Sequence, residues 1–431
     1  DQQADVLRSQ ISNAQQQIDA LEAELADNQQ KEESQYDLFC RQVRDEEERG
    51  TASFWSVIFK ATSFSDLLGR IDFINEVAEH DQSVINDLRQ LRQQMQADRQ
   101  ALENGDSFSM ILLGDPQGYV KYDINQPLFE LQTAWIADNV DNLKIKAVLC
   151  TGDLVEQNDN LVPDRSMLNQ TLRQMWESVS RSFTRLDNVV PYIISCGNHD
   201  YGYRHAENGM TRFPEYFPIE RNRTWFDCAV AVFPNRNGVE SFENAAFEFD
   251  DPNWGKLLVV CNEFAPRDEV LDWTRDLISG DRFRNHRVIY ITHSLIGEGK
   301  AERTDNEPYG ITPRNWGGQV WEKLIEPSEN IVLALCGHMG ELGGFENSVG
   351  YRVDPNAAGK PVPQMMFNVQ TLGGGWEGNG GDGWLRILEF MPDGVTVKVR
   401  TYSPLFGISP STRHLAHRRG DIDEFEMKLA R

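Results

Sequence analysis

Apolar residues recur at alternating steps of three and four along the first hundred residues of the chain. The rhythm between Ile74 and Leu102 repeats that of an earlier arm, whose seam is Leu7, Ile11, Ala14, Ile18, Leu21 and Leu25. This spacing indicates a coiled coil, because it places one apolar stripe along each helix. The stretch between the arms, residues 51–71, is too apolar for a solvated turn. The pattern predicts an antiparallel helical hairpin over residues 1–104 with a small helical cap at its tip.

The pattern changes from Ser107 onward, where short apolar runs alternate with helical stretches. The runs predict strands at 109–114, 145–150, 190–196, 256–261, 287–292, 330–336 and 364–370. The stretches between them predict helices at 126–143, 165–184, 267–279 and 316–326. This alternation is typical of an α/β fold, and we assign residues 105–431 to one such domain. A hairpin near its end is predicted to turn at Pro392, Asp393 and Gly394.

The composition argues against a nucleic-acid partner, a membrane span and a disulfide framework. The chain has 67 Asp and Glu against 42 Lys and Arg, a formal net charge of −25. Because this charge repels a nucleic-acid backbone, we expect no such partner. No apolar run reaches the roughly 20 residues of a membrane-spanning helix. The six cysteines form no CxxC pair and no cluster, so no disulfide framework is predicted. The chain opens on Asp1 rather than Met, which fits a processed form whose export signal is gone.

Five consecutive strand ends each carry side chains suited to binding a metal ion. In chain order they are Asp115 with Gln117, then Asp153, then Asn198 with His199 and Asp200, then His293, and last His338. Open α/β folds place their sites at the carboxyl ends of their strands. We therefore expect these side chains to converge at one edge of the sheet.

The mixture of ligands indicates the chemistry. Carboxylate, amide and imidazole groups suit divalent Mn, Fe, Zn or Ni. Asp153 lies in the middle of the set, where a carboxylate can bridge two cations. Two ions roughly 3.5–4 Å apart can clamp a phosphoryl group and lower the pKa of a bridging water. The sequence therefore predicts a two-metal site for phosphoester hydrolysis.

The order D-x-Q, GD, GNHD, TH and GH resembles the calcineurin-like metallophosphoesterase superfamily over about residues 108–405. The resemblance implies that superfamily's α/β sandwich as the fold. It also implies a division of the ligands between two metal sites. Asp153 would bridge the sites, whose other ligands would be Asp115 and Gln117 in the first and Asn198, His293 and His338 in the second.

The same resemblance implies a mechanism. A metal-bridging hydroxide would attack phosphorus in line while the second site polarises the phosphoryl oxygens. His199 would be the proton donor or electrostatic partner of the leaving oxygen. Asp200 would orient His199.

Two positions depart from the common superfamily pattern. Gln117 stands where many members have a histidine, and Gly340 stands where many have the second histidine of GHxH. A neutral amide oxygen is usually a poorer donor for a transition metal than imidazole. We therefore predict one tightly bound ion and one labile ion, with the weaker site at Asp115 and Gln117.

Substrate contacts are less well determined by the sequence. The candidates are Tyr119, Tyr201, His205, Lys300 and Arg303. Lys300 and Arg303 are the nearest cations after His293, while His205 fits a surface-loop histidine equally well. The glycine-rich segment 373–383 lacks the Lys and Ser/Thr of a phosphate-binding loop, which favours a flexible wall.

The helical arm has its own resemblance. The run S-F-S-D-L-L-x-R-I-D, within about residues 35–100, is similar to the coiled-coil module of Gram-positive peptidoglycan hydrolases that act at division. In those enzymes the module docks to a membrane-embedded activator. The resemblance implies such an activator as a partner, and an extracytoplasmic location, secreted or associated with the cell envelope.

Three hypotheses follow. The first is a metal-dependent phosphoester hydrolase, a phosphatase or phosphodiesterase, carried on a coiled-coil adaptor. The second is a catalytically weak or inactive scaffold of the cell envelope, motivated by Gln117 and Gly340. The third is a nucleotidase with an aromatic clamp drawn from Tyr119, Tyr201, Tyr203, Tyr309 and Trp376.

Overall fold

The computed structural model describes residues 107–161 and 168–430. The chain divides into two units, Asp1–Glu103 and Asn104–Arg431. The helical hairpin predicted over residues 1–104 therefore lies outside the described residues. Within the described ranges, no helix is both long and apolar enough to cross a bilayer.

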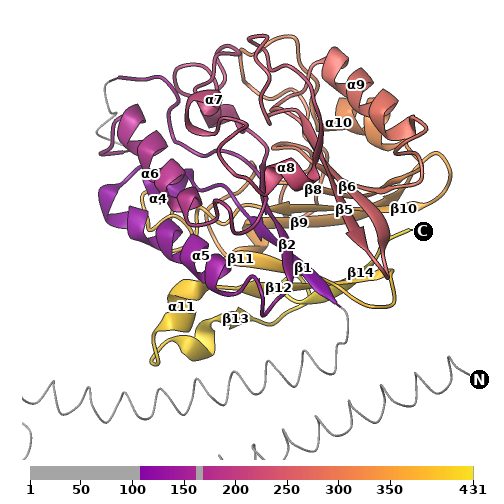
Figure 1. Cartoon of the computed structure of the whole chain (residues 1–431). Helices are drawn as coiled ribbons and strands as arrows, with labels where there is room; N and C mark the ends of the chain where they lie inside the picture. The colour runs from indigo at the N-terminus through magenta and orange to yellow at the C-terminus, as the bar shows by residue number, and fades with distance from the viewer. Residues whose placement is uncertain (1–106, 162–167, 431) are drawn as a thin grey trace, which may run out of the picture. The chain divides into compact units, whose positions relative to one another are not determined.

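Two seven-stranded sheets form the centre of the second unit (Figure 1). The first sheet has the order β13-β12-β11-β1-β2-β3, and β14 pairs with β12. Strands β1, β2 and β3 run parallel, and the remaining pairs are antiparallel. The strands are β1 (Phe108–Leu113), β2 (Ile145–Cys150), β3 (Tyr192–Ile194), β11 (Leu385–Phe390), β12 (Thr396–Tyr402), β13 (His417–Arg418) and β14 (Phe425–Lys428).

The second sheet has the order β4-β5-β6-β7-β8-β10-β9. Its four central strands, β6, β7, β8 and β10, are parallel. The strands are β4 (Ala229–Val232), β5 (Ala245–Asp251), β6 (Gly255–Cys261), β7 (Arg287–Ile291), β8 (Ile331–Cys336), β9 (Val349–Pro355) and β10 (Pro361–Phe367).

Side-chain alternation along β6 shows how the layers form. Leu257, Val259 and Cys261 belong to a large core that also contains residues of the first sheet. Leu258 and Val260 lie in a second cluster that contains residues of helix α9 (Asp268–Ser279). Since successive side chains of a strand point to opposite faces, this apolar run is buried on both sides. The result is an α/β sandwich, as predicted.

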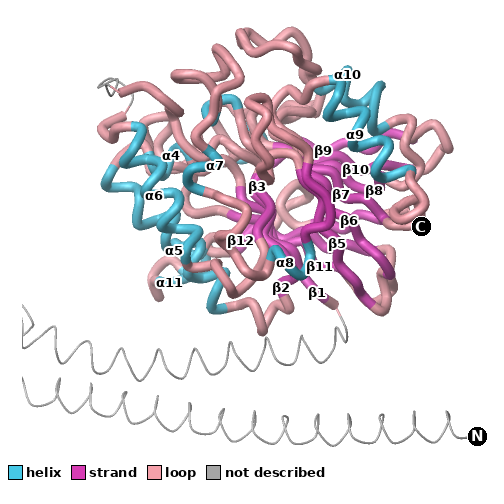
Figure 2. The backbone as a smooth tube through the Cα atoms, turned by 45° about the horizontal axis from the view of Figure 1, so that its top comes forward, coloured by secondary structure: helices cyan, strands magenta, loops and turns pink. Residues whose placement is uncertain are grey.

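Helices cover the sheets from outside. Figure 2 shows α5 and α6 on one side of the strands and α9 and α10 on the other. The longer helices are α5 (Gln126–Asp138), α6 (Leu172–Thr184) and α9 (Asp268–Ser279). The short ones are α4 (Gln117–Val120), α7 (Phe213–Tyr216), α8 (Trp225–Cys228), α10 (Gly317–Val320) and α11 (Pro404–Ile408).

All seven predicted strands are present, but some predicted helices differ in extent. The helix predicted at 165–184 begins at Leu172, because Thr171 and Gln174 form a capping box there. The helix predicted at 126–143 ends at Asp138. The helix predicted at 316–326 is α10 followed by a π-helical turn, Trp321–Ile325.

The sequence prediction omitted five strands, β4, β5, β9, β13 and β14. Strand β9 lies at a sheet edge and exposes Tyr351 and Val353, so it lacks the continuous apolar run of a central strand. The terminal hairpin is confirmed, since β11 and β12 pair across a turn in which Gly394 has a φ of 69°.

Candidate metal centre

The predicted ligands come from strand ends in both sheets. Asp115 and Asp153 follow β1 and β2 of the first sheet, whereas His293 and His338 follow β7 and β8 of the second. Asn198 lies in the helical turn after β3. Side-chain contacts link Asp153, Asn198, His293 and His338, and Asp115 accepts a hydrogen bond from the backbone amide of His338. The carboxyl-terminal edges of the two sheets therefore meet at one place.

His293 holds the centre of this group. Its Nδ1 lies 2.7 Å from the carbonyl oxygen of Thr151, which can only accept a hydrogen bond. Nδ1 therefore carries a hydrogen, and in the neutral ring Nε2 carries a lone pair. That Nε2 faces three further acceptors, namely Asn198 Oδ1 at 3.0 Å, His338 Nδ1 at 3.1 Å and Asp153 Oδ2 at 3.2 Å.

The tautomer of His338 is fixed by its own hydrogen bond, and it is the opposite of that of His293. Its Nε2 lies 2.6 Å from Glu307 Oε2, and an ionised carboxylate only accepts hydrogen bonds. Nε2 therefore carries the hydrogen, and Nδ1 presents a lone pair to His293. Four acceptor atoms from Asp153, Asn198, His293 and His338 thus converge. Such a group is stable only around positive charge, and its donors suit a divalent transition metal.

The electrostatics agree with this demand for positive charge. Burial lowers the pKa of His293, but the carboxylates of Asp153 and Asp115 outweigh it and raise that pKa to about 10. Burial raises the pKa of Asp153, but the positive charges of His293 and His199 lower it more, to well below its usual range. A proton or a metal ion can therefore supply the charge that this point requires.

Glycines allow the strand ends to approach. A Cβ at Gly197 would lie 2.1 Å from Asp153 Oδ1, and one at Gly152 would lie 2.4 Å from the Ser195 carbonyl oxygen. Asp153 itself has a φ of 50°, a left-handed conformation that aspartate tolerates better than most residues. The GD and GN pairs of the sequence are thus needed to place the Asp153 carboxylate.

Asp115 and Gln117 form the neighbouring half of the site. Asp115 accepts hydrogen bonds from the Thr151 hydroxyl at 2.8 Å and the His338 amide at 2.9 Å. Burial and the nearby Asp153 raise its pKa to about 6, against the opposing effect of His293. Gln117 donates from Nε2 to Gln370 Oε1 at 2.7 Å.

This last hydrogen bond leaves the Gln117 amide oxygen, Oε1, buried and without a partner among the described residues. A buried acceptor without a partner is costly, so it needs a ligand or a cation. The residues present therefore fit a second divalent ion. Gly340 supplies no side chain, and a Cβ there would meet only Asn347 and Asn368 at 3.5 to 3.7 Å. The asymmetry between the two sites remains a prediction.

His199 lies beside these ligands, but its ring is not held as predicted. Its amide donates to Asp153 Oδ1, and its Nδ1 lies 2.7 Å from the carbonyl oxygen of Glu156. Asp200 instead accepts from the amides of Gly197, Leu154 and Val155. The prediction that Asp200 orients the His199 ring is therefore wrong. Asp200 ties the loops after β2 and β3 together.

Three of the predicted substrate contacts have partners within the fold. Tyr119 is buried, and its hydroxyl accepts from the Gly383 amide. Tyr201 is buried and donates to Glu243. Arg303 pairs with Asp354 at 2.7 Å and stacks on Trp321. These contacts hold the three side chains within the fold, and their contact with a substrate stays a prediction.

His205 is placed differently. Its ring centroid lies 6.0 Å from that of His199 and 5.9 Å from that of Tyr309. Tyr309 in turn packs against His338, with 5.7 Å between centroids. His205 and Tyr309 thus form a wall beside the ligands, and a substrate contact by His205 stays a prediction. Lys300 is exposed on the loop after His293, and its role also stays a prediction.

The glycine-rich segment 373–383 is a packed wall and not a loose one. A Cβ at Gly118 would lie 2.8 Å from Gly380 Cα, so two glycines allow the segment to lie against helix α4. Asn125 donates to the Gly378 carbonyl oxygen at 2.7 Å. The segment therefore supports the turn that carries Gln117.

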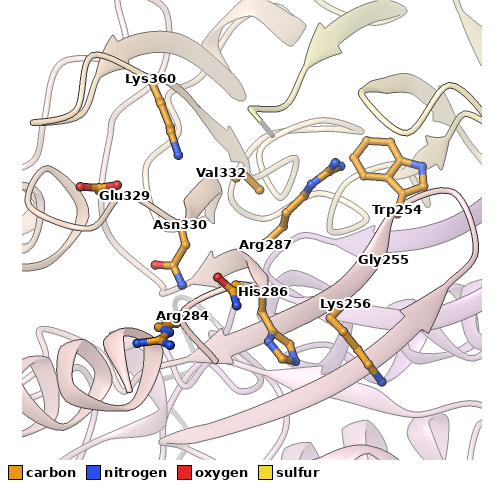
Figure 3. A pocket seen from close by; sticks show the side chains of 11 residues that line it. Trp254, Gly255, Lys256, Arg284, His286, Arg287, Glu329, Asn330, Val332 and Lys360 are labelled. Carbon is orange, nitrogen blue, oxygen red and sulfur yellow. The ribbon is translucent and has the colours of Figure 1, made fainter. Parts of the chain in front are cut away.

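A cavity of about 380 Å³ lies elsewhere, at the amino-terminal ends of β6, β7 and β8 (Figure 3). Five basic side chains line it, and four of them have partners. Lys256 pairs with Asp250, Arg284 with Asp281, and His286 with Glu248. Arg287 donates to the Gly394 carbonyl oxygen and stacks on Trp254. These compensated charges give no argument for an anion site.

Comparison with known protein families gives two matches. The family model described as calcineurin-like phosphoesterase matches residues 108–342, more than half of the chain. The model of the coiled-coil domain of peptidoglycan hydrolase PcsB matches residues 25–104. Both resemblances drawn from the sequence are confirmed.

Individual relatives are more distant. The uncharacterized protein YvnB of Bacillus subtilis (strain 168) is 25% identical over 329 residues, which are 75% of this chain and 22% of that protein. The chain thus spans about a fifth of that relative's length. A dimetal phosphatase from Danio rerio aligns with a TM-score of 0.41 and 10% identity, over 75% of this chain and 99% of that one. GAP50, the anchor in the inner membrane complex of Plasmodium, has a TM-score of 0.40 and 10% identity, over 75% and 89%.

Proposed function

The chain belongs to the calcineurin-like phosphoesterase family, and from that premise we propose that it is a metal-dependent phosphoester hydrolase carried on a coiled-coil adaptor. One observation carries the proposal: Asn198 Oδ1, His338 Nδ1 and Asp153 Oδ2 all lie within 3.2 Å of His293 Nε2. When bound, two divalent ions would generate the nucleophile and neutralise the phosphoryl oxygens.

The side chains can be assigned to two metal sites. Asp153 contacts His293 through one carboxylate oxygen and the His199 amide through the other. It therefore suits the shared ligand, with Asn198, His293 and His338 completing one site. Asp115 and the unpartnered oxygen of Gln117 suit the other site.

His199 suits the role of the acid that assists the leaving oxygen. Since its Nδ1 is held by the Glu156 carbonyl oxygen, Nε2 is the nitrogen that remains for the substrate. A positioned imidazole contributes about a hundred- to ten-thousandfold to a hydrolysis rate. His205 and Tyr309 form the wall on the same side, which supports a contact between His205 and the group bonded to phosphorus.

The coiled coil gives the proposed cellular setting. The match to the PcsB coiled-coil domain supports an extracytoplasmic place at the cell envelope, with a membrane-embedded activator as the partner. Fractionation of the native cells tests this directly. Recovery of the protein with the envelope supports the proposal, and recovery with the cytoplasm contradicts it.

A second candidate function is an inactive envelope scaffold that acts through the coiled coil. Gln117 and Gly340 favour it, because both weaken the first metal site. The nucleotidase hypothesis has less support, since Tyr119 and Tyr201 are buried in the fold and cannot clamp a base.

Hydrolysis of an aryl phosphodiester and an aryl phosphomonoester separates the first two functions. The full chain is stripped of metal, reconstituted with Mn²⁺ and compared with an Asp153→Asn variant. Turnover that requires both Mn²⁺ and Asp153 supports a hydrolase, and its ratio between the two esters assigns the class. Absence of turnover in metal-loaded protein favours the scaffold.

A further inference from the structure

A carboxylate outside the sequence motifs contacts the proposed metal centre. Glu307 lies on the loop between β7 and α10, and 7% of its side chain is exposed. Its Oε2 is 2.6 Å from His338 Nε2, and its Oε1 accepts from the Ser294 hydroxyl, also at 2.6 Å. Both oxygens therefore have donors, and one donor is the ring of a proposed metal ligand.

This contact decides which nitrogen of His338 faces the ion. Because the Glu307 carboxylate accepts from Nε2, the neutral ring keeps its lone pair on Nδ1, 3.1 Å from His293 Nε2. Without Glu307, either tautomer would be available, and the ring could turn about its χ2 bond. A carboxylate partner also makes an imidazole a more basic ligand.

We propose that Glu307 is a positioning residue for the second metal site, fixing the tautomer and orientation of His338 and thereby strengthening metal binding. The inference rests on the proposed function, because it takes His338 as a ligand. Glu307 also links the two histidine-bearing strand ends, since Ser294 directly follows His293.

The loop that carries Glu307 has other anchors. The Thr304 amide donates to the Leu295 carbonyl oxygen at 3.1 Å, and the Ile311 amide donates to that of Ala206 at 2.8 Å. Thr304 also accepts from the Gly317 amide at 3.1 Å. Because these bonds do not involve the Glu307 side chain, its replacement should leave the loop in place.

The test compares three variants of the full chain. Glu307→Gln keeps a hydrogen-bond acceptor but loses the charge, and Glu307→Ala loses both. Asp305→Asn, on an exposed residue of the same loop, is the matched control. We expect Mn²⁺ affinity at the tighter site to fall about tenfold for Gln and about a hundredfold for Ala. The control should bind Mn²⁺ like the unchanged protein, and all three should unfold at similar temperatures without metal.

A spectroscopic readout separates positioning from a merely structural role. Nitrogen NMR of the histidine rings, with the His338 signals assigned by their loss in His338→Ala, should show hydrogen on Nε2 with and without metal. A hydrogen on Nδ1 in the unchanged protein would overturn the proposal, and so would unchanged Mn²⁺ affinity in Glu307→Ala. If the unchanged protein bound no metal at all, the proposed function itself would fail, which is a distinct outcome.

Discussion

The two ends of the parallel strands carry polar groups in contrasting arrangements. At the carboxyl-terminal edge, Asp153, Asn198, His293 and His338 turn acceptor atoms toward one another. At the amino-terminal edge, Glu248 lies among three partners, the cations Lys256 and Arg282 and the imidazole of His286. Both edges are rich in charge, but only one leaves facing groups of the same polarity.

This difference shows which clusters of charged residues indicate a ligand-binding site. Opposite charges in contact satisfy each other, so a cluster such as that of Glu248 needs no further ligand to be stable. Converging lone pairs are unfavourable until a cation arrives. The number of charged residues around a cavity is therefore a weaker indication of function than the pairing among them.

The largest expected effect comes from removing a ligand at the carboxyl-terminal edge. Asn198→Ala or His338→Ala should lose the tighter ion and with it all measurable turnover. Elemental analysis after gel filtration measures the metal content. Lys256→Ala, at the opposite edge, is the control and should keep full metal content. Normal metal content in both ligand variants would contradict the assignment.

The next largest effect is expected from replacing His199, which we propose contacts the substrate and not the metal ions. His199→Ala should lower kcat by about a hundred- to ten-thousandfold while the metal content stays unchanged. Parallel rate and metal measurements test this. An equal loss of metal in the variant would mean that His199 serves binding of the ion instead.

A variant that retains both ions would test the predicted difference in affinity between the two metal sites. Gln117→His restores an imidazole, and Gln370 Oε1 remains as an acceptor for its second nitrogen. We expect this variant to keep two ions through mild chelation where the unchanged protein keeps one, as followed by elemental analysis against time. Two equally retained ions in the unchanged protein would remove the asymmetry.

The smallest effect belongs to the amino-terminal edge. Burial raises the pKa of Glu248, but hydrogen bonds from His286, Arg282 and Lys256 lower it more, to a net value below the ordinary 4.5. A carboxylate with a lowered pKa stabilises the fold above its ordinary pKa, and this contribution is lost as the pH falls.

Glu248→Gln should therefore reduce the free energy of unfolding by less than about 1 kcal/mol at neutral pH. The difference from the unchanged protein should shrink as the pH falls below 4.5. Urea denaturation at several pH values measures it. A difference that grew on acidification would contradict the lowered pKa of Glu248. A change in metal content would contradict the independence of the two edges.

The sequence predicted the convergence of ligands because a simple topological rule applies. Parallel strands end at a common edge, so residues such as Asp153 and His293 meet although they are far apart in the chain. The central strands could also be predicted, because runs such as 257–261 are apolar throughout.

The positions that escaped prediction depend on tertiary packing. Glu307 and Gln370 lie in loops at no fixed spacing from a motif, so nothing local marks them as partners of His338 and Gln117. Tyr119 and Tyr201 follow the motifs directly, so the sequence alone favours substrate contacts. The turns that carry them direct their rings into the core instead.

The most direct test of the central claim is a crystal structure of the full chain grown with Mn²⁺, in which anomalous scattering locates the metal. We expect an ion bonded to Asp153, Asn198, His293 and His338 at about 2.0–2.3 Å, with His338 binding through Nδ1. An ion bound elsewhere, or these four side chains hydrogen-bonded to protein groups with no ion among them, would contradict it.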